Sequence, residues 1–300
     1  MPIRESTLIR TTGESPTAAL PSSSTWTDYG ALIAVGRNVF AMWQAELGDA
    51  IGSNELNEEV QVGAEDGEAE AAEPKQPQLT WYASAHEYWD DEANCPLSDD
   101  GVLGGFAHVS GVDIRESKRF LTHIRDSLRP KWECGAAADC GAGIGRVSKQ
   151  LLLPMFQHVD LVEQSPRLLR GVSLYLGADE QLRSRVRRLY CTGLQDFEPT
   201  AASYDLIWLQ WVLVHLTDVD CVRFLRRCKQ ALTPQGFVVI KENIFQHGEP
   251  YDLDRQDSSI TRSAVYYKSL FQQAGLTLLA ERRQRHFPEE LYPVKMYALV

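Results

Sequence analysis

The sequence predicts an α/β fold, in which a doubly wound, mostly parallel sheet of seven strands carries helices on both faces. Three observations lead to it. From residue 134 onward, short apolar segments alternate with amphipathic helical segments, as they do in consecutive strand–helix–strand units. The first apolar segment runs directly into a glycine-rich loop, ADCGAGIGRV at 138–147, and the second ends in a carboxylate, Glu163. Ligands of such sheets bind beyond the carboxyl ends of the strands, so we expect the functional site there.

Residues 1–78 differ from the rest of the chain and are predicted to be a partly disordered N-terminal extension. Residues 14–25 are rich in Ser, Thr and Pro, whereas 27–51 carry apolar side chains at the spacing of one amphipathic helix. An acidic linker without Lys or Arg follows and holds Glu55, Glu58, Glu59, Glu65, Asp66, Glu68, Glu70 and Glu73. Residues 79–300, which are dense in predicted strands and helices, form the second predicted domain.

The predicted strands of the second domain are short apolar segments bounded by polar or glycine-rich turns. CGAAADC is a strand of small residues that feeds the glycine loop, HVDLVEQ is an apolar strand, and SYDLIWLQWV runs into a loop. In chain order the predicted strands are 134–140, 158–164, 186–194, 203–212, 236–243, 277–283 and 294–300.

Helices are predicted where apolar residues recur at every third or fourth position. Tyr82, Ala85 and Trp89 share one face of the first of them, and Thr217 is the expected N-cap of a later one. Residues 98–114 have little periodicity and are predicted to be a glycine-rich loop. The predicted helices are 81–89, one from Asp113 to the residues before Pro130, 146–156, 166–176, 217–232 and 258–274.

Composition and charge exclude several functional classes. The acidic linker accounts for most of the formal net charge of −11, and this balance gives no support to nucleic-acid binding. No stretch approaches the ~20 apolar residues of a membrane helix, and the N-terminus lacks the apolar core of a secretory signal. The six cysteines form no CxxC pair and the histidines are not spaced as metal ligands, so we expect no metal site. Reduced thiols and the missing signal predict a location in the cytoplasm, the nucleus or both.

The glycine loop distinguishes between two cofactors. Its spacing, Gly141-x-Gly143-x-Gly145, misses the GxGxxG pattern that holds the pyrophosphate of a dinucleotide. The form D/E-x-GxGxG suits S-adenosylmethionine, which has no phosphate. Asp139 then has the right place to meet the cofactor's amino group, and Arg146 can hold its carboxylate.

Two later strand ends support the same cofactor. Glu163 ends the second strand, where a carboxylate accepts both ribose hydroxyls. Gln195 and Asp196 follow the third strand, where the adenine amino group would be read. We therefore expect S-adenosylmethionine to bind and NAD not to bind.

The segment after the fourth strand, LQWVLVHLTD, offers groups for a methyl acceptor. Trp211 presents a flat apolar face that suits a proline ring. His215 titrates near neutral pH and can take a proton from an α-amino group, whose pKa is roughly 7.7–8. The residues alone leave a second interpretation open, in which Trp211 is a core residue and His215 a packed loop histidine.

The segment after the fifth strand, KENIFQHGEPYDLDRQDSS, is the other candidate. Asn243 ends the strand, and Asp254 and Asp257 follow in a polar loop with Ser258 and Ser259. The carboxylates predict an acidic pocket for a cationic peptide side chain. Alternatively, the last Asp and Ser residues only cap the next helix.

From Trp81 to Val300 the chain resembles the protein α-N-terminal methyltransferases, which act on N-termini beginning Xaa-Pro-Lys or Xaa-Pro-Arg. GLQDF and YDLIWLQWVLVHLTD are far more specific for this family than any glycine loop. The resemblance implies a Rossmann-like class I methyltransferase fold and methyl transfer from S-adenosylmethionine, which leaves S-adenosylhomocysteine. The other matching stretches are YASAHEYW, GVLGGFAHVSGVDI, DCGAGIGRVSK, LLLPMF, FLRRCK, IKEN and DSS.

The resemblance also implies roles for single residues. Glu163 stands where the family usually has Asp, and Glu242 likewise replaces an Asp beside Asn243. The cofactor contacts that it implies, together with those predicted from the loop, are Asp139, Gly141, Gly143, Arg146, Glu163, Leu194, Gln195 and Gln210.

On the substrate side, the resemblance implies that His215 and Asp257 are proton acceptors. Trp211 matches the residue that packs on the substrate's proline, and Asn243 matches a partner of the peptide backbone. Asp254 and Ser259 match groups that line the pocket for the cation of the third residue, and Trp89 with Tyr88 matches the lid over the peptide. The oligomeric state and the number of methyl groups added stay open.

Two rival functions remain at this point. A methyltransferase for a small amine metabolite would share the glycine loop, although Trp211, Asn243 and the two aspartates argue against it. The second rival is an inactive domain that serves as a binding module. Intact Asp139, Arg146, His215 and Asp257 disfavour that interpretation.

Overall fold

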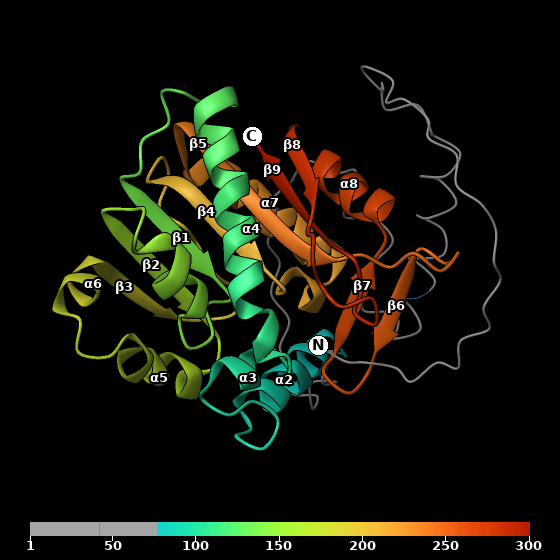
Figure 1. Ribbon diagram of the computed structural model, residues 1–300. Coiled ribbons are helices and arrows are strands. Elements are labelled where there is room, and N and C mark those ends of the chain that lie inside the picture. The colour runs from blue at the N-terminus through green and yellow to red at the C-terminus, as the bar shows by residue number, and fades with distance from the viewer. Residues whose placement is uncertain (1–41, 43–76) are drawn as a thin grey trace, which may run out of the picture.

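The computed structural model describes Met42 and residues 77–300 (Figure 1). The predicted disordered segment at 14–25 and the acidic linker lie outside the described residues. So does the predicted helix at 27–51, except Met42, which is helical and buried.

Seven strands form one sheet in the order β3-β2-β1-β4-β5-β9-β8. Strands β1 to β5 pair in parallel, and β9 runs antiparallel to both β5 and β8. The prediction of a doubly wound, mostly parallel, seven-stranded sheet is therefore confirmed. The strands are β1 Ala136–Cys140, β2 His158–Glu163, β3 Val186–Cys191, β4 Tyr204–Gln210, β5 Leu232–Asn243, β8 Leu278–Arg283 and β9 Val294–Leu299.

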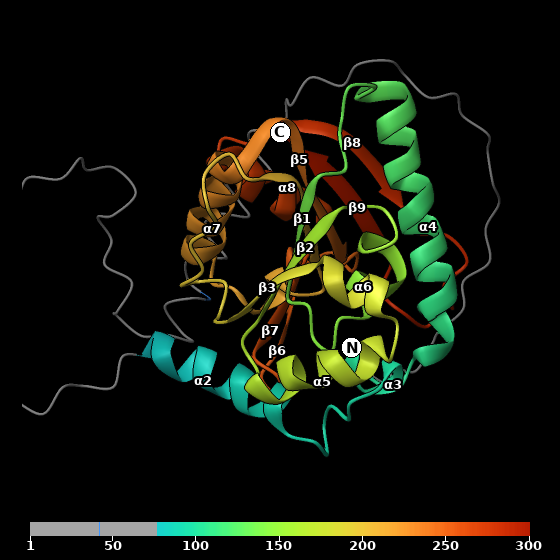
Figure 2. The same ribbon diagram turned by 90° about the vertical axis from the view of Figure 1, so that its left-hand side faces the viewer.

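Alternation within the strands divides the core into two layers. In β4, Leu206 and Trp208 pack into one layer, whereas Ile207 and Leu209 pack into the other. Because successive side chains of a strand point to opposite faces, an apolar strand such as this one supplies both layers. Figure 2 shows α4 on one side of the sheet and α7 and α8 on the other.

The helices are α2 Pro77–Asp90, α3 Asp99–Val102, α4 Ser110–His123, α5 Pro166–Leu176, α6 Glu180–Arg185, α7 Asp218–Ala231 and α8 Ala264–Gln273. The predicted N-cap is confirmed: the side chain of Thr217 accepts a hydrogen bond from the Asp220 N–H and starts α7. Helices α2, α3 and α5 lie together at one end of the molecule (Figures 1 and 2). The predicted helix at 146–156 begins at Arg146 as expected but ends at Leu152, and its residues Ser148–Leu152 are π-helical.

Two stretches differ from their prediction. The expected loop at 98–114 contains α3, whose N-cap Ser98 accepts from the Gly101 N–H, and the start of α4 at Ser110. The last helix begins at Ala264 rather than near 258, because Ser263 is its N-cap. The residues before it form a hairpin of β6, Tyr251–Asp254, with β7, Ser259–Arg262. Ser258 and Ser259 therefore belong to this hairpin and do not cap the helix.

In the described part of the chain, no helix is both long and apolar enough to cross a membrane. All six cysteines are free thiols, and Cys95, Cys140, Cys221 and Cys228 are buried.

Candidate active site

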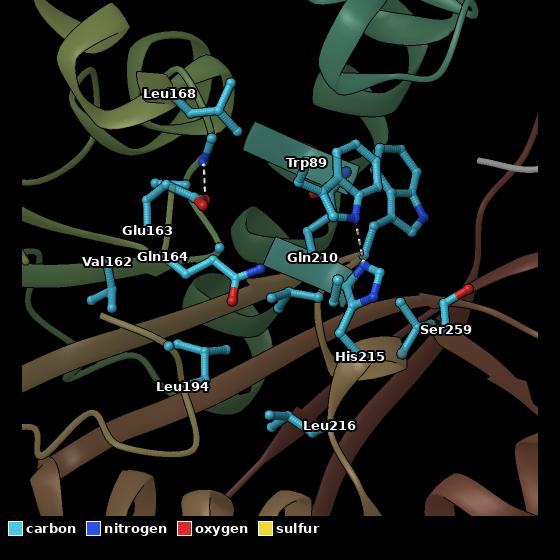
Figure 3. Close-up of a pocket in the computed structure, with 18 of the residues that line it drawn as sticks. Trp89, Val162, Glu163, Gln164, Leu168, Leu194, Gln210, His215, Leu216 and Ser259 are labelled. Atoms are coloured by element: carbon cyan, nitrogen blue, oxygen red, sulfur yellow. Dashed lines mark hydrogen bonds between the residues drawn. The ribbon is translucent and has the colours of Figure 1, made fainter. Parts of the chain in front are cut away.

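A single pocket at the carboxyl ends of β1, β2, β4 and β5 gathers almost all residues predicted for the site (Figure 3). Helix α2 and the β6–β7 hairpin contribute to its walls. Of the predicted residues, Trp89, Asp139, Gly141, Gly143, Arg146, Glu163, Leu194, Gln195, Gln210, Trp211, His215, Asn243, Asp257 and Ser259 line it.

Tyr88, Asp196 and Ser258 do not line the pocket, and neither does Asp254. Asp254 ends β6, is only partly exposed, and accepts a hydrogen bond from the Gln256 N–H at 2.8 Å. Burial raises the pKa of Tyr88, and the negative charges of Asp257 and Asp254 raise it further. Asp254 therefore acts electrostatically on Tyr88, as Asp257 does, from outside the pocket lining.

The glycine loop is tied to the neighbouring strand. Gly141 has φ of 76° and Gly143 has φ of 56°, a backbone region that favours glycine. A Cβ on Gly141 would lie 2.6 Å from Cγ2 of Val212, so the loop also packs too closely for a side chain there. The Gly143 N–H donates to Oε2 of Glu163 at 2.9 Å. The loop and the acidic end of β2 thus form one rigid edge of the pocket.

Two carboxylates of this edge, Glu163 and Asp139, are buried and hydrogen-bonded. Oε1 of Glu163 accepts from the Ser165 N–H at 2.9 Å, and burial raises the pKa of Glu163 although these N–H bonds oppose it. Asp139 accepts from the Ser148 hydroxyl at 2.6 Å, and burial raises the pKa of Asp139 to about 6.

A cluster of buried ions lies beside the glycine loop, and we call it the Asp113 cluster. It consists of Asp113 on α4, Arg146, Gln210 and Lys241. Asp113 pairs with Arg146 at 2.8 Å and with the Lys241 ammonium, and it accepts two hydrogen bonds of 3.0 Å from Gln210. Asp113 and Lys241 are fully buried. Burial opposes ionisation of Asp113, but the two cations lower its pKa below the ordinary value.

Two members of the Asp113 cluster, Asp113 and Lys241, were not predicted for the site, and the sequence indicated Asp113 only as the start of a helix. One signal was present: Lys241 interrupts the apolar strand GFVVIKEN. A lysine within a buried strand requires an anionic partner. The partner's identity could not be read locally, because Asp113 lies 128 residues earlier in the chain.

The turn after β4 contains a residue with an unusual backbone conformation, Trp211, and is held by the buried carboxylate of Glu242. Trp211 has φ of 54°, which is rare for a bulky side chain and typical of a functional constraint. Its ring centroid lies 5.7 Å from Cζ of Arg146. Oε1 of Glu242 accepts from the N–H groups of Val212 and Leu213, each at 2.9 Å, and so holds the turn in place. Burial raises the pKa of Glu242 to about 8.

Three buried polar atoms of the pocket have no partner within the described chain. They are Nε1 of Trp211, Oδ1 of Asn243 and Oδ1 of Asp257. An unsatisfied buried donor or acceptor costs about 1–3 kcal/mol. Their clustering in one pocket indicates a ligand that supplies the missing hydrogen bonds.

His215 is enclosed from several sides. Its Nε2 lies 3.1 Å from the indole nitrogen of Trp89 (Figure 3). Its Nδ1 lies 3.0 Å from the carbonyl oxygen of Ser258. The indole N–H of Trp81 donates to the main-chain oxygen of His215 at 2.8 Å. Burial lowers the pKa of His215, although the nearby Asp257 charge raises it. Burial therefore favours the neutral form of the imidazole.

No group of three or more His, Cys, Asp or Glu side chains within residues 77–300 is arranged to hold a metal ion. The geometry combines a glycine loop with an acidic strand end on one side and an indole, an amide, a carboxylate and a neutral imidazole on the other.

Comparisons with known proteins identify the family of this chain. The family model described as AdoMet dependent proline di-methyltransferase matches residues 77–300. The human protein called N-terminal Xaa-Pro-Lys N-methyltransferase 1 is 45% identical over 219 residues, which are 73% of this chain and 95% of the human protein. The mouse protein of the same name is 44% identical over the same shares.

A solved structure agrees with this assignment. It is a SAM-dependent methyltransferase from Leishmania major, 35% identical, which aligns with a TM-score of 0.70 over 87% of this chain and 91% of its own. The sheet is thus that of a class I S-adenosylmethionine-dependent methyltransferase, as predicted. The chain belongs to the AdoMet dependent proline di-methyltransferase family.

Proposed function

We propose that this protein transfers methyl groups from S-adenosylmethionine to the α-amino group of protein N-termini that begin Xaa-Pro-Lys or Xaa-Pro-Arg. The observation that carries the proposal is the trio of unpaired buried atoms on Trp211, Asn243 and Asp257, in the same pocket as the glycine loop. The names of the human and mouse relatives support the substrate class.

The residues at the glycine loop fit the cofactor. When bound, S-adenosylmethionine supplies a methyl group whose sulfur leaving group is displaced in line by an amine nitrogen. Each carboxylate oxygen of Glu163 holds one N–H group and keeps a lone pair for the ribose hydroxyls. Arg146 and Gln210 would hold the carboxylate, and Asp139 would meet the amino group. Leu194 and Gln195 line the end of the pocket where we place the adenine.

The other half of the pocket fits a peptide chain end. The Trp211 indole offers a flat face to a proline ring and an N–H to a peptide carbonyl. The unpaired Asn243 oxygen would accept from a backbone N–H. Asp257 and Ser259 would meet the third residue's cation, with Asp254 adding negative charge at the rim. Trp89 covers this half from α2.

We assign to His215 and Asp257 the role of receiving the proton of the substrate ammonium. A neutral imidazole whose pKa is lowered can accept this proton only from a closely positioned donor. Once the amine has lost its proton, its nitrogen has the lone pair that methyl transfer would require. Secondary and tertiary amine products keep a lone pair, so the same groups serve repeated transfers.

Mass spectrometry on a model peptide tests the proposal. An Xaa-Pro-Lys peptide incubated with enzyme and S-adenosylmethionine should gain methyl groups at the α-nitrogen, and an N-acetylated copy should gain none. A panel of small amines offered in parallel should stay unmodified. Methylation of a small amine with none of the peptide would contradict the proposal, and binding of NAD in place of S-adenosylhomocysteine would refute the cofactor.

A further inference from the structure

The hydrogen bonds of His215 define its tautomer. The Ser258 carbonyl can only accept, so Nδ1 of His215, at 3.0 Å, must carry a proton. The Trp89 indole N–H can only donate, so Nε2, at 3.1 Å, must be the unprotonated nitrogen. Both partners are therefore satisfied by one form of the ring, the neutral Nδ1–H imidazole. A protonated ring would point Nε2–H at another N–H.

The Trp89 side chain also occupies the position that the substrate needs. Nε2 carries the only lone pair of the ring that can receive a proton, and the indole N–H is directed at it. The rings meet edge to face, with centroids 5.8 Å apart. An ammonium N–H is a donor of the same kind as an indole N–H, so the substrate can replace Trp89 without a change at His215.

The helix that carries Trp89 is held at both ends against the site. Arg167, in the first turn of α5, donates to the main-chain oxygens of Trp89 at 3.1 Å and Asp90 at 2.6 Å. Towards the start of α2, Tyr82 donates to Asp220 at 2.5 Å. The backbone of α2 is thus held against the site, and displacement of the indole N–H requires a motion of the Trp89 side chain only.

We propose that Trp89 is a positioning residue that keeps His215 in its neutral Nδ1–H form and covers Nε2 until the substrate amine displaces the indole N–H. The role of His215 as proton acceptor rests on the proposed function. The tautomer and the masking of Nε2 belong to the free protein and do not depend on it.

The chain offers a matched control. Trp81 lies on the same helix and donates its indole N–H to the same residue, but to the main-chain oxygen of His215. Trp89→Phe and Trp81→Phe each remove one N–H that is directed at His215, and only the first removes the bond to Nε2. Titratable groups on the elements packed around His215 remain in both variants: Tyr82, Tyr88, Asp218, Asp220, Glu242, Asp257 and Arg262.

NMR titration of the His215 ring in the free, full-length protein is the primary test, with its signal assigned by loss in His215→Asn. In the unmodified protein the ring ¹⁵N shifts should show a protonated Nδ1 and an unprotonated Nε2. The donor from Trp89 favours the neutral ring, so Trp89→Phe should raise the His215 pKa by about 0.4–1 unit, from a bond of ~0.5–1.5 kcal/mol. Trp81→Phe should leave that pKa in place while lowering the melting temperature.

The pH dependence of kcat/KM with one Xaa-Pro-Lys peptide supplies the second readout. The acidic limb should move to higher pH in Trp89→Phe and stay in place in Trp81→Phe. A protonated Nε2 in the free protein, or equal shifts in the two variants, would overturn the proposal. Failure of the proposed function would look different: the unmodified enzyme would not methylate the peptide, whereas the free-protein titration would still report on Trp89.

Discussion

The two halves of the pocket differ in how their polar groups are satisfied. In the half that we assign to the cofactor, called the cofactor half, the ions of the Asp113 cluster are paired with one another, and Glu163 and Asp139 accept hydrogen bonds from the protein. In the half that we assign to the peptide, called the peptide half, Trp211, Asn243 and Asp257 each keep a buried polar atom without a partner. The first half is complete before any ligand arrives, and the second is completed only by its ligand.

This difference indicates which half of the pocket determines affinity and which half determines specificity. A preorganised set of charges binds its ligand with little rearrangement. Unpaired buried groups favour the one ligand that satisfies them and reject an analogue lacking the matching donor or acceptor. We therefore expect changes in the cofactor half to affect stability and cofactor affinity. Changes in the peptide half should affect turnover and substrate choice.

The largest effect is expected in the peptide half, at Asp257. Asp257→Asn keeps the shape but removes the charge, so methyl transfer to an Xaa-Pro-Lys peptide should fall by roughly 10²–10⁴-fold. Affinity for S-adenosylhomocysteine, measured by isothermal titration, should survive. Asp254→Asn is the matched control, because Asp254 shares the hairpin but not the pocket lining, and it should mainly raise KM for the peptide. Unchanged kcat in Asp257→Asn would remove this carboxylate from the mechanism.

In the cofactor half, Asp113→Asn should break the paired network. It leaves Arg146 and Lys241 buried without their anion, which should cost about 3–5 kcal/mol of unfolding free energy. Chemical denaturation measures this loss, and titration should show weaker S-adenosylhomocysteine binding. Asp126→Asn removes an exposed ion pair with Arg125 and should change stability by less than about 1 kcal/mol. Equal losses of unfolding free energy in the two variants would show that the buried network stabilises the fold no more than an exposed ion pair does.

Trp211 tests substrate choice within the peptide half. Trp211→Ala should lower kcat/KM for peptides with proline second by about tenfold to a hundredfold, and for peptides with alanine second by less. Trp211→Phe keeps a ring but removes the unpaired N–H, so proline preference should survive in it. The measurement is kcat/KM on the two peptides, compared side by side. An equal loss on both would show that Trp211 does not recognise the proline.

The smallest effect concerns Glu242, beneath the turn that carries Trp211. Its folded-state pKa of about 8 lies above the ordinary value of 4.5, so the folded protein binds this proton more tightly than the unfolded chain. The resulting stabilisation is complete below pH 4.5 and is lost as pH rises through about 8. Glu242→Gln should therefore gain in melting temperature relative to the unmodified protein between pH 5 and pH 8. A constant difference across that range would contradict the pKa shift.

The strands and the glycine loop could be predicted because their signals are local. A continuous apolar segment marks β4, and the loop's glycines stand where φ is positive. The hairpin before α8 could not be predicted, because Asp257 and Ser263 are both plausible caps and the pairing of β6 with β7 decides between them.

Contacts between residues far apart in the sequence could not be predicted. Asp113 meets Gln210 across 97 positions, and Trp89 meets His215 across 126. Single residues in these contacts were predicted for the site, but the partner of each depends on the order of the strands. The difference between a satisfied and an unsatisfied half of the pocket therefore becomes visible only in the folded chain.

A crystal structure with S-adenosylhomocysteine and an Xaa-Pro-Lys peptide tests the central claim most directly. The claim predicts the α-amino nitrogen within hydrogen-bond distance of Nε2 of His215, the proline ring on Trp211, and partners for the unpaired atoms of Trp211, Asn243 and Asp257. A peptide bound outside this pocket, or inside it with those three atoms still unpaired, would contradict the account.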